Sequence, residues 1–328
     1  MRIVFCGTPH FAVPTLKHLF AQPGFEIAGV ITQPDRPRGR GMKLSFSPVK
    51  EAAFAAGLPV HQPEKIRSPE AQTMLQKLAP DCIVIIAYGQ IIPANLLSIS
   101  KYGWINLHAS LLPKYRGAAP IQWAIARDET TTGLTTMRID AGMDTGELLL
   151  QHEIEIGPKE IAPELAARMA EAGAPLMAET LRGIAAGNLS AHPQEHTQAT
   201  YAPLLKKEDG EIDWTRSAQE IYNRMRAFTP WPGAFTRFRG HAYHVWAEPS
   251  TSEVRNLEAP LPPGTLRVAK GFYQNLGVGE KLGALLVSCG RATELRIVSV
   301  KREGGKSVDP LEWAYGVRLT EGERLGDS

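Results

Sequence analysis

The feature of this sequence that most constrains its fold is a short apolar run near position 85. Residues 82–87 read Cys-Ile-Val-Ile-Ile-Ala, with no polar side chain among them. A strand with one face in water alternates apolar and polar residues, whereas a central strand of a parallel sheet is covered on both faces. We therefore expect residues 81–87 to form a central parallel strand, whose parallel neighbours must be joined by long crossovers such as helices.

The N-terminal segment predicts the same architecture. Residues 2–6 form a compact apolar run that ends at Gly7, residues 11–20 have helical spacing, and residues 26–32 form a second apolar run. The order strand, turn, helix, strand is typical of a doubly wound nucleotide-binding fold. The predicted fold class is α/β, with a doubly wound, mostly parallel Rossmann-like sheet in the N-terminal part.

The turn after the first strand argues against a dinucleotide-binding dehydrogenase. The fingerprint of such enzymes contains three glycines that let the pyrophosphate approach the backbone. After Gly7, this chain has Pro9 and Ala12 where the second and third glycines would stand. Asp35 could imitate the ribose-binding acid, but the missing glycines make nicotinamide chemistry a poor explanation of the sequence.

Composition limits the remaining classes. At 328 residues the chain is long enough for two domains, and its net charge of +2 gives no global basic field that would demand a nucleic acid. Cys6, Cys82 and Cys289 are scattered without the spacing of a metal site, so we expect buried, reduced thiols. No apolar run approaches the roughly 20 residues that span a bilayer. We therefore expect a soluble, cytoplasmic protein that contacts neither membrane nor DNA.

Two candidate catalytic residues lie at the end of another predicted strand. The run from Trp104 to Leu107 indicates the end of a buried strand, which places Asn106 and His108 on one face because strand side chains alternate. Ligands of open α/β sheets tend to bind at the carboxyl ends of the strands. An amide donor that stabilises an oxyanion, beside an imidazole that moves a proton, suits acyl chemistry. The alternative is a strand end whose Asn and His only cap turns.

A second segment makes the catalytic interpretation more specific. The loop that follows the predicted strand 133–139 carries two carboxylates, Asp140 and Asp144, and two glycines, Gly142 and Gly146. Glycines let a backbone come close to a ligand. A carboxylate in this loop could orient the histidine and stabilise its protonated form.

Together these motifs resemble the signature of the 10-formyltetrahydrofolate-dependent formyltransferases. The motifs are Asn-x-His at 106–108, Ser-Leu-Leu-Pro at 110–113, Tyr-Arg-Gly at 115–117 and Asp-x-Gly-x-Asp-Thr-Gly at 140–146. The similarity covers nearly the whole chain, through residues 3–9, 32–41 and 226–233. The family's catalytic Asn, His and Asp fall on Asn106, His108 and Asp144. The residue after the histidine is often Gly in this family and is Ala109 here, a small substitution.

The resemblance implies 10-formyltetrahydrofolate as the formyl donor. It also implies a pterin pocket lined by the backbone after the central strand and by the two signature loops. The residues implied in this pocket are Tyr88, Gly89, Gln90, Ser110, Leu111, Leu112, Pro113, Asp140 and Gly142. No metal is implied: His192 and His196 are spaced like helical ligands, but Pro193 lies between them and no third ligand follows.

Within the family, the chain is similar to members that formylate the free α-amino group of charged initiator methionyl-tRNA for translation initiation. A tetrahedral intermediate would be stabilised by Asn106 and His108, with Asp144 assisting proton transfer. A formyltransferase acting on a small-molecule amine, such as a purine precursor or a sugar nucleotide, would share these three residues. A noncatalytic RNA-binding protein with a degenerate nucleotide fold would give no reason for the three to occur together.

Two basic regions favour tRNA over a small amine. Residues 33–47 show neither helical nor strand periodicity, so we expect a long exposed loop, and the resemblance implies that it contacts the acceptor stem. The basic residues of this loop are Arg36, Arg38, Arg40 and Lys43. A second cluster contains Lys301, Arg302 and Lys306, which could bind an RNA backbone through its phosphates.

The chain is predicted to divide into three parts. Residues 1–189 would form a formyl-folate-binding catalytic domain, and the loosely patterned residues 190–207 a linker. Residues 208–328 would form a C-terminal tRNA-binding domain, in which several short strands at close spacing predict a small OB-like β-barrel. We expect the chain to act as a monomer.

Overall fold

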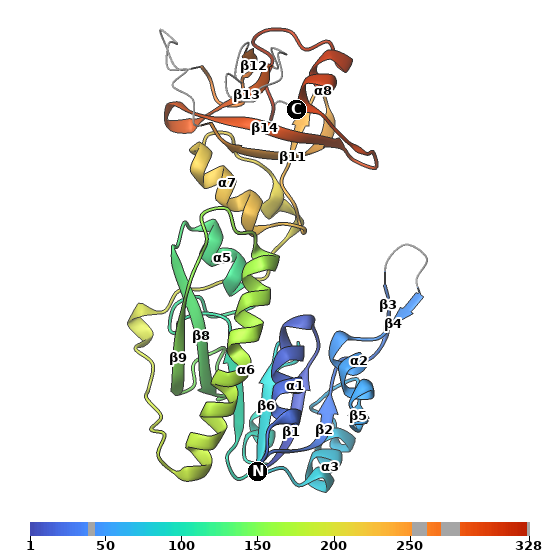
Figure 1. The fold of residues 1–328 in the computed structure, drawn as a ribbon, viewed down its shortest axis with the longest axis vertical. Helices are drawn as coiled ribbons and strands as arrows, with labels where there is room; N and C mark the ends of the chain where they lie inside the picture. The colour runs from blue at the N-terminus through green and yellow to red at the C-terminus, as the bar shows by residue number, and fades with distance from the viewer. Residues whose placement is uncertain (39–42, 251–260, 270–282, 327–328) are drawn as a thin grey trace. The chain divides into compact units, whose positions relative to one another are not determined.

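The protein divides into two compact units (Figure 1). The structure, a computed structural model, describes residues 1–38, 43–250, 261–269 and 283–326. The first unit contains residues 1–121, 130–158 and 164–204, and the second contains residues 122–129, 159–163 and 205–328. The segment 190–204 therefore packs with the first unit.

A seven-stranded sheet forms the centre of the first unit, with the strand order β5-β2-β1-β6-β7-β8-β9. The first five strands of this order are parallel to one another, β8 runs antiparallel to β7, and β9 runs antiparallel to β8. The strands are β1 (Arg2–Gly7), β2 (Glu26–Ile31), β5 (Val60–His61), β6 (Cys82–Ile86), β7 (Trp104–His108), β8 (Thr131–Arg138) and β9 (Leu148–Glu155). The predicted doubly wound, mostly parallel sheet is thus confirmed.

The apolar run that suggested this fold lies where it was expected. Strand β6 pairs with β1 on one side and with β7 on the other. All five of its residues are buried, since both faces of the strand are covered. The buried thiols expected at Cys6, Cys82 and Cys289 are also confirmed. Burial raises the pKa of the Cys82 thiol to about 12, so this group stays neutral.

Two helices of the first unit, α2 and α3, begin at a serine that caps them. The helices of the first unit are α1 (Val13–Ala21), α2 (Pro48–Ala55), α3 (Pro69–Leu78), α4 (Ala94–Leu97) and α6 (Ala162–Ala186). Ser47 and Ser68 each accept a hydrogen bond from a backbone N–H of the first helical turn, and proline follows each of them. In α6, a Cβ on Gly173 would lie 2.5 Å from Leu107 of β7. Glycine therefore lets this helix pack closely behind the strand that carries Asn106 and His108.

The basic segment 33–47 was expected to lack regular structure, and this expectation was wrong for residues 36–38 and 43–45. Strands β3 (Arg36–Arg38) and β4 (Lys43–Ser45) pair as an antiparallel hairpin that belongs to no larger sheet. The hairpin extends from the residues before α2 (Figure 1). At its base, Lys50 of α2 bonds to Asp35 and, at 2.7 Å, to Gln62. The Lys50 ammonium lowers the pKa of the Asp35 carboxyl.

The second unit is built on an antiparallel sheet with the order β10-β11-β14-β13-β12, in which β15 pairs with β14. Its strands are β10 (Phe235–Phe238), β11 (His241–Pro249), β12 (Leu266–Ala269), β13 (Ala284–Cys289), β14 (Thr293–Arg302) and β15 (Ser307–Val308). Helices α7 (Ala218–Ala227) and α8 (Pro310–Gly316) belong to the same unit, and α5 (Pro120–Ala126) contributes residues to it.

The C-terminal segment joins the two edges of this sheet. The backbone N–H of Leu325 donates to Gly264 O at 2.9 Å beside β12, and that of Gly326 donates to Arg237 O at 2.9 Å in β10. A Cβ on Gly264, which has φ +86°, would lie 2.4 Å from Leu325 O, so only glycine fits. The sheet is thus closed into the small barrel that the sequence predicted.

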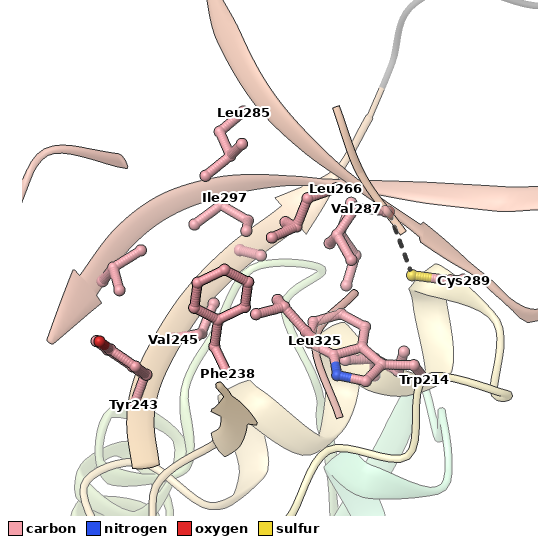
Figure 2. Close-up of a cluster of buried hydrophobic side chains, with 14 of the residues drawn as sticks. Trp214, Phe238, Tyr243, Val245, Leu266, Leu285, Val287, Cys289, Ile297 and Leu325 are labelled. Atoms are coloured by element: carbon pink, nitrogen blue, oxygen red, sulfur yellow. Dashed lines mark hydrogen bonds between the residues drawn. The ribbon is translucent and has the colours of Figure 1, made fainter. Parts of the chain in front are cut away.

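The barrel encloses its own hydrophobic core. Figure 2 shows side chains from several strands converging around Phe238, with Trp214 and Leu325 beside it. The ring of Phe238 meets that of Trp313 in α8 edge to face, with centroids 5.2 Å apart. Each unit therefore buries a separate core. Among the helices of the described ranges, none has the length and hydropathy of a membrane span.

Candidate active site

Asn106 and His108 lie at the carboxyl end of β7, two residues apart and on one side of the sheet. Strand β7 is the last strand of the parallel part, and Asn106 pairs with Ile85 of β6 on one side and Met137 of β8 on the other. His108 is 6% exposed. This edge of an open α/β sheet is where ligands bind in such folds.

The two ring nitrogens of His108 have different surroundings. Nε2 lies 2.9 Å from the carbonyl oxygen of Tyr115, and Nδ1 lies 3.7 Å from Oδ1 of Asp144. A carbonyl oxygen can only accept a hydrogen bond. In the neutral ring the proton is therefore on Nε2, which donates a hydrogen bond to the carbonyl oxygen of Tyr115. Nδ1 is then left facing the carboxylate, which attracts the ring when Nδ1 also becomes protonated.

Asp144 is held by a backbone amide from the other signature loop. Its Oδ2 accepts a hydrogen bond of 2.8 Å from the N–H of Gly117, and its backbone has φ +53°. Gly117 has φ +116°, and a Cβ there would lie 2.7 Å from Ala202 O. Glycine is therefore required at 117, and its amide fixes the carboxylate beside His108.

One residue outside the predicted set completes this arrangement. Gln194 donates from Nε2 to the backbone oxygens of Asp144 and Gly146, at 2.9 and 2.8 Å. Its Oε1 accepts from Nη2 and Nε of Arg116, at 2.6 and 3.1 Å. Sequence reasoning missed Gln194 because it stands in a polar, loosely patterned stretch with no motif of its own.

In the predicted folate pocket, residues 110–113 are hydrogen-bonded to Thr135 of β8. The Thr135 hydroxyl donates to Ser110 O at 2.7 Å and accepts from Leu112 N at 3.1 Å. Gln151 donates to the same hydroxyl at 3.0 Å and to Leu112 O at 2.9 Å. Thr135 is fully buried, so its bonds to Ser110 and Leu112 are shielded from water.

Three other residues of the predicted pocket, Tyr88, Gln90 and Asp140, are engaged in contacts within the protein. Tyr88 is buried in the core of the first unit, and its carbonyl oxygen accepts hydrogen bonds from Thr8 Oγ1 at 3.0 Å and from Gln33 Nε2 at 3.1 Å. Gln90 is bonded to Ile66 N at 2.7 Å and to Glu64 O at 3.2 Å. Oδ1 of Asp140 accepts from Gly142 N at 3.0 Å and from a threonine hydroxyl of the same loop, which shapes the loop before Asp144.

The predicted RNA contacts of the first unit fall on the hairpin. Arg36 is exposed and lies 3.5 Å from Glu64. Arg38 and Lys43 face each other as the last described pair of the hairpin and pair backbone to backbone. Arg40 lies outside the described residues.

In the second unit, Arg302 lines a hollow of about 410 Å³ on the barrel. The charged and titratable residues of the hollow are Lys207, Arg237, His241, His244, Arg302 and Glu303. Nη2 of Arg302 lies 3.3 Å from His241 Nδ1. The other two residues of the predicted cluster, Lys301 and Lys306, are exposed but do not line the hollow. Across the described ranges, no group of three or more His, Cys, Asp or Glu side chains is arranged to hold a metal ion.

Comparison with known proteins identifies the family. Residues 1–181 match the formyl transferase model, and residues 204–318 match the model of the formyl transferase C-terminal domain. The chain is 50% identical to the methionyl-tRNA formyltransferase of Koribacter versatilis, covering 99% of each chain. It is also 50% identical to that of Solibacter usitatus, covering 100% of this chain and 99% of the relative.

The fold is shared with a solved N-formyltransferase from Helicobacter canadensis, in complex with folinic acid and dTDP-3-aminofucose. The TM-score is 0.61 at 17% identity, covering 90% of this chain and 98% of that one. This likeness concerns the fold, whereas the two family models and the identity to curated relatives concern the whole sequence. The chain belongs to the methionyl-tRNA formyltransferases, an enzyme family of formyl transfer.

Proposed function

We propose that this enzyme transfers the formyl group of 10-formyltetrahydrofolate to the free α-amino group of methionyl initiator tRNA. The identity of 50% to methionyl-tRNA formyltransferases over the whole chain carries this choice of substrate. The close approach of His108 and Asp144, beside Asn106, supports the choice of site. Formyl transfer to the initiator prepares it for translation initiation, and we assign the enzyme to the cytoplasm, where it acts as a monomer.

The reaction forms one C–N bond and breaks another. The lone pair of the α-amine attacks the formyl carbon, and the carbonyl oxygen becomes an oxyanion in a tetrahedral intermediate. The bond to the folate nitrogen then breaks, and the proton lost by the amine ends on that nitrogen. A free α-amine has a pKa of about 7.7–8.0 and is partly neutral at physiological pH, so no strong base is needed.

The residues at the end of β7 suit the two requirements of this reaction, which are to stabilise the oxyanion and to deliver a proton to the folate nitrogen. The Asn106 amide and the protonated ring of His108 are donors that stabilise the oxyanion. Asp144 stabilises the ring while it is protonated and thereby assists transfer of the proton to the departing nitrogen. The contact of Nε2 with Tyr115 O, at 2.9 Å, fixes the ring so that the other nitrogen takes part in this exchange.

The formyl donor would lie along the same edge of the sheet. The backbone of residues 88–90 follows β6, which pairs directly with β7, so a pterin held there is next to Asn106. Gly89 has φ +89° and is exposed, so its backbone can approach a ligand without an intervening side chain. The segments Ser110–Pro113 and Asp140–Gly142 complete the proposed pocket.

We assign the tRNA to two basic surfaces. The hairpin residues Arg36, Arg38 and Lys43, with Arg40, would contact the acceptor end. The C-terminal barrel, with Lys301, Arg302 and Lys306, would contact phosphates of the tRNA backbone. On this proposal residues 1–189 form the catalytic domain, residues 190–207 a linker, and residues 208–328 the tRNA-binding domain.

A competing assignment is a formyltransferase acting on a small amine, such as a sugar nucleotide or a purine precursor. Purified protein should be incubated with 10-formyltetrahydrofolate and either methionyl initiator tRNA, a dTDP-amino sugar or an amino precursor of purines. We expect formyl-methionyl-tRNA as the product and no formylation of the small amines. Formylation of a small amine without formylation of methionyl-tRNA would overturn the assignment.

A further inference from the structure

We propose that Gln194 is a positioning residue for formyl transfer, which holds the loop that carries Asp144 in register with His108. This inference rests on the proposed function, because it concerns the geometry of the same site. Gln194 does not touch the reacting groups. It acts through the backbone of Asp144.

The burial of Gln194 is the first observation. It is 5% exposed, whereas His192, Pro193 and Glu195 around it are exposed. A glutamine side chain is costly to bury unless its amide is hydrogen-bonded. A single polar side chain turned inward from an otherwise exposed stretch therefore indicates a specific contact.

The contacts of this amide use both of its ends. Oε1 can only accept, and it faces the Arg116 guanidinium at 2.6 and 3.1 Å. Nε2 can only donate, and it faces the carbonyl oxygens of Asp144 and Gly146 at 2.9 and 2.8 Å. The reversed amide would place acceptor against acceptor and donor against donor, so only one orientation fits. Arg116 itself is 3% exposed, so the whole connection is shielded from water.

Through Gln194, these contacts add a second connection between the loop with residues 116–117 and the loop with residues 140–146. Gly117 N already donates to the Asp144 carboxylate. Arg116, the preceding residue, is joined through Gln194 to the Asp144 backbone. The carboxylate and the carbonyl of Asp144 are therefore both fixed to the 116–117 loop. A φ of +53° is uncommon, although aspartate tolerates it better than most residues, and these external bonds help to hold Asp144 in it.

The consequence concerns turnover more than substrate affinity. Without Gln194, the Asp144 carboxylate keeps one backbone bond but loses the support of its main chain. A displacement of about 1 Å in a catalytic constellation can lower the rate about a hundredfold. Neither Asp144 O nor Gly146 O is available to a substrate while Gln194 is bonded to them, so substrate binding should change little.

Two substitutions separate the two ends of the amide. Gln194→Ala removes both ends. Gln194→Glu keeps an acceptor for Arg116 but cannot donate to the two carbonyl oxygens. We expect both variants to lower kcat at least about tenfold, with the KM values for formyl donor and methionyl-tRNA within about twofold of wild type. Gln198→Ala, at an exposed glutamine four residues later, is the matched control and should retain wild-type turnover.

A double-mutant cycle with Asp144→Asn distinguishes positioning from general stabilisation. If Gln194 acts through Asp144, adding Gln194→Ala to Asp144→Asn should cost less than about twofold more. Fully additive losses, or folded Gln194 variants with wild-type kcat, would overturn this inference while leaving the proposed function intact. An Asp144→Asn enzyme with wild-type turnover would overturn the role proposed for Asp144 and, with it, this inference. If Gln194→Ala does not fold, the cycle is measured with Gln194→Glu.

Discussion

Nδ1 of His108 lies 3.7 Å from Oδ1 of Asp144. The two residues come from strand β7 and from the loop between β8 and β9, so the pair exists only in the folded sheet. The distance exceeds that of a hydrogen bond, but it places a carboxylate beside the one ring nitrogen that is not donating to Tyr115. This arrangement supports the proposal that the His108 ring moves a proton during the reaction.

The first prediction concerns the two partners of His108 in catalysis. Asn106→Ala removes the proposed oxyanion donor, and Asp144→Ala removes the carboxylate beside the ring. Each should lower turnover at least about a hundredfold, the scale of a single oxyanion or acid–base group. Steady-state kinetics with methionyl-tRNA, together with circular dichroism to establish folding, provide the measurement. A folded variant of either kind with near wild-type turnover would contradict its assigned role.

The second prediction concerns Thr135, whose hydroxyl bonds to Ser110, Leu112 and Gln151. Thr135→Val removes the hydrogen-bond partner of the buried Ser110 carbonyl oxygen and Leu112 N–H, which should destabilise the protein by about 1–3 kcal/mol. The loop Ser110–Pro113 should become less well fixed, and the KM for the formyl donor should rise. Chemical denaturation and steady-state kinetics test both effects. Thr131→Val, at an exposed position of the same strand, should change neither quantity.

The third prediction is a pH dependence of stability. Hydrogen bonding to Lys50 lowers the pKa of Asp35 in the folded protein. A lowered folded pKa means that the carboxylate stabilises the fold above its ordinary pKa of about 3.9, and that this contribution is lost as the pH falls through the folded value. The free energy of unfolding of wild type should therefore exceed that of Asp35→Asn by a constant amount between about pH 5 and 7.

That difference should shrink below about pH 4. Urea denaturation of both proteins from pH 7 to 3 provides the measurement, and Glu153→Gln, which changes an exposed carboxylate on β9, is the control. A difference that stays constant down to pH 3 would show that the Asp35 charge does not support the base of the hairpin.

The fourth prediction concerns the basic surface of the barrel. Neutralising Lys301, Arg302 and Lys306 together should weaken binding of any tRNA about equally and reduce the salt dependence of binding, since each phosphate contact releases counterions. Arg302→Met alone isolates the contribution of the hollow that this residue lines. Binding titrations at several salt concentrations test this, with formyl-folate binding as the unchanged control. A salt slope equal to that of wild type in the triple variant would place the RNA contact elsewhere.

The sequence predicted the fold well because its signals were local. The apolar run of β6 indicated a strand covered on both faces, and the several short strands expected in the C-terminal part are present in the second unit. The barrel's closure was not visible in any local pattern. It depends on residues 323–326 meeting β12 and β10, which are distant in the sequence.

The candidate site was predicted less completely. Asn106 and His108 follow from strand alternation, and the carboxylate loop has its own motif. Gln194 could not be found in this way, because nothing local distinguishes it from the polar residues around it. Its importance comes from a hydrogen-bond connection to Arg116 and to the Asp144 backbone, which only the folded chain creates. The hairpin was missed for a different reason: its strands have three residues each, too few to show a period of two.

The most direct test of the central claim is the rate of formyl transfer by His108→Ala. The rate should be measured in a single turnover, with the variant in excess over methionyl initiator tRNA and with saturating 10-formyltetrahydrofolate. We predict a rate at least about a hundredfold below wild type at an unchanged melting temperature, while His152→Ala, at an exposed histidine of β9, transfers normally. A folded His108→Ala enzyme that transfers the formyl group within about threefold of the wild-type rate would contradict the account.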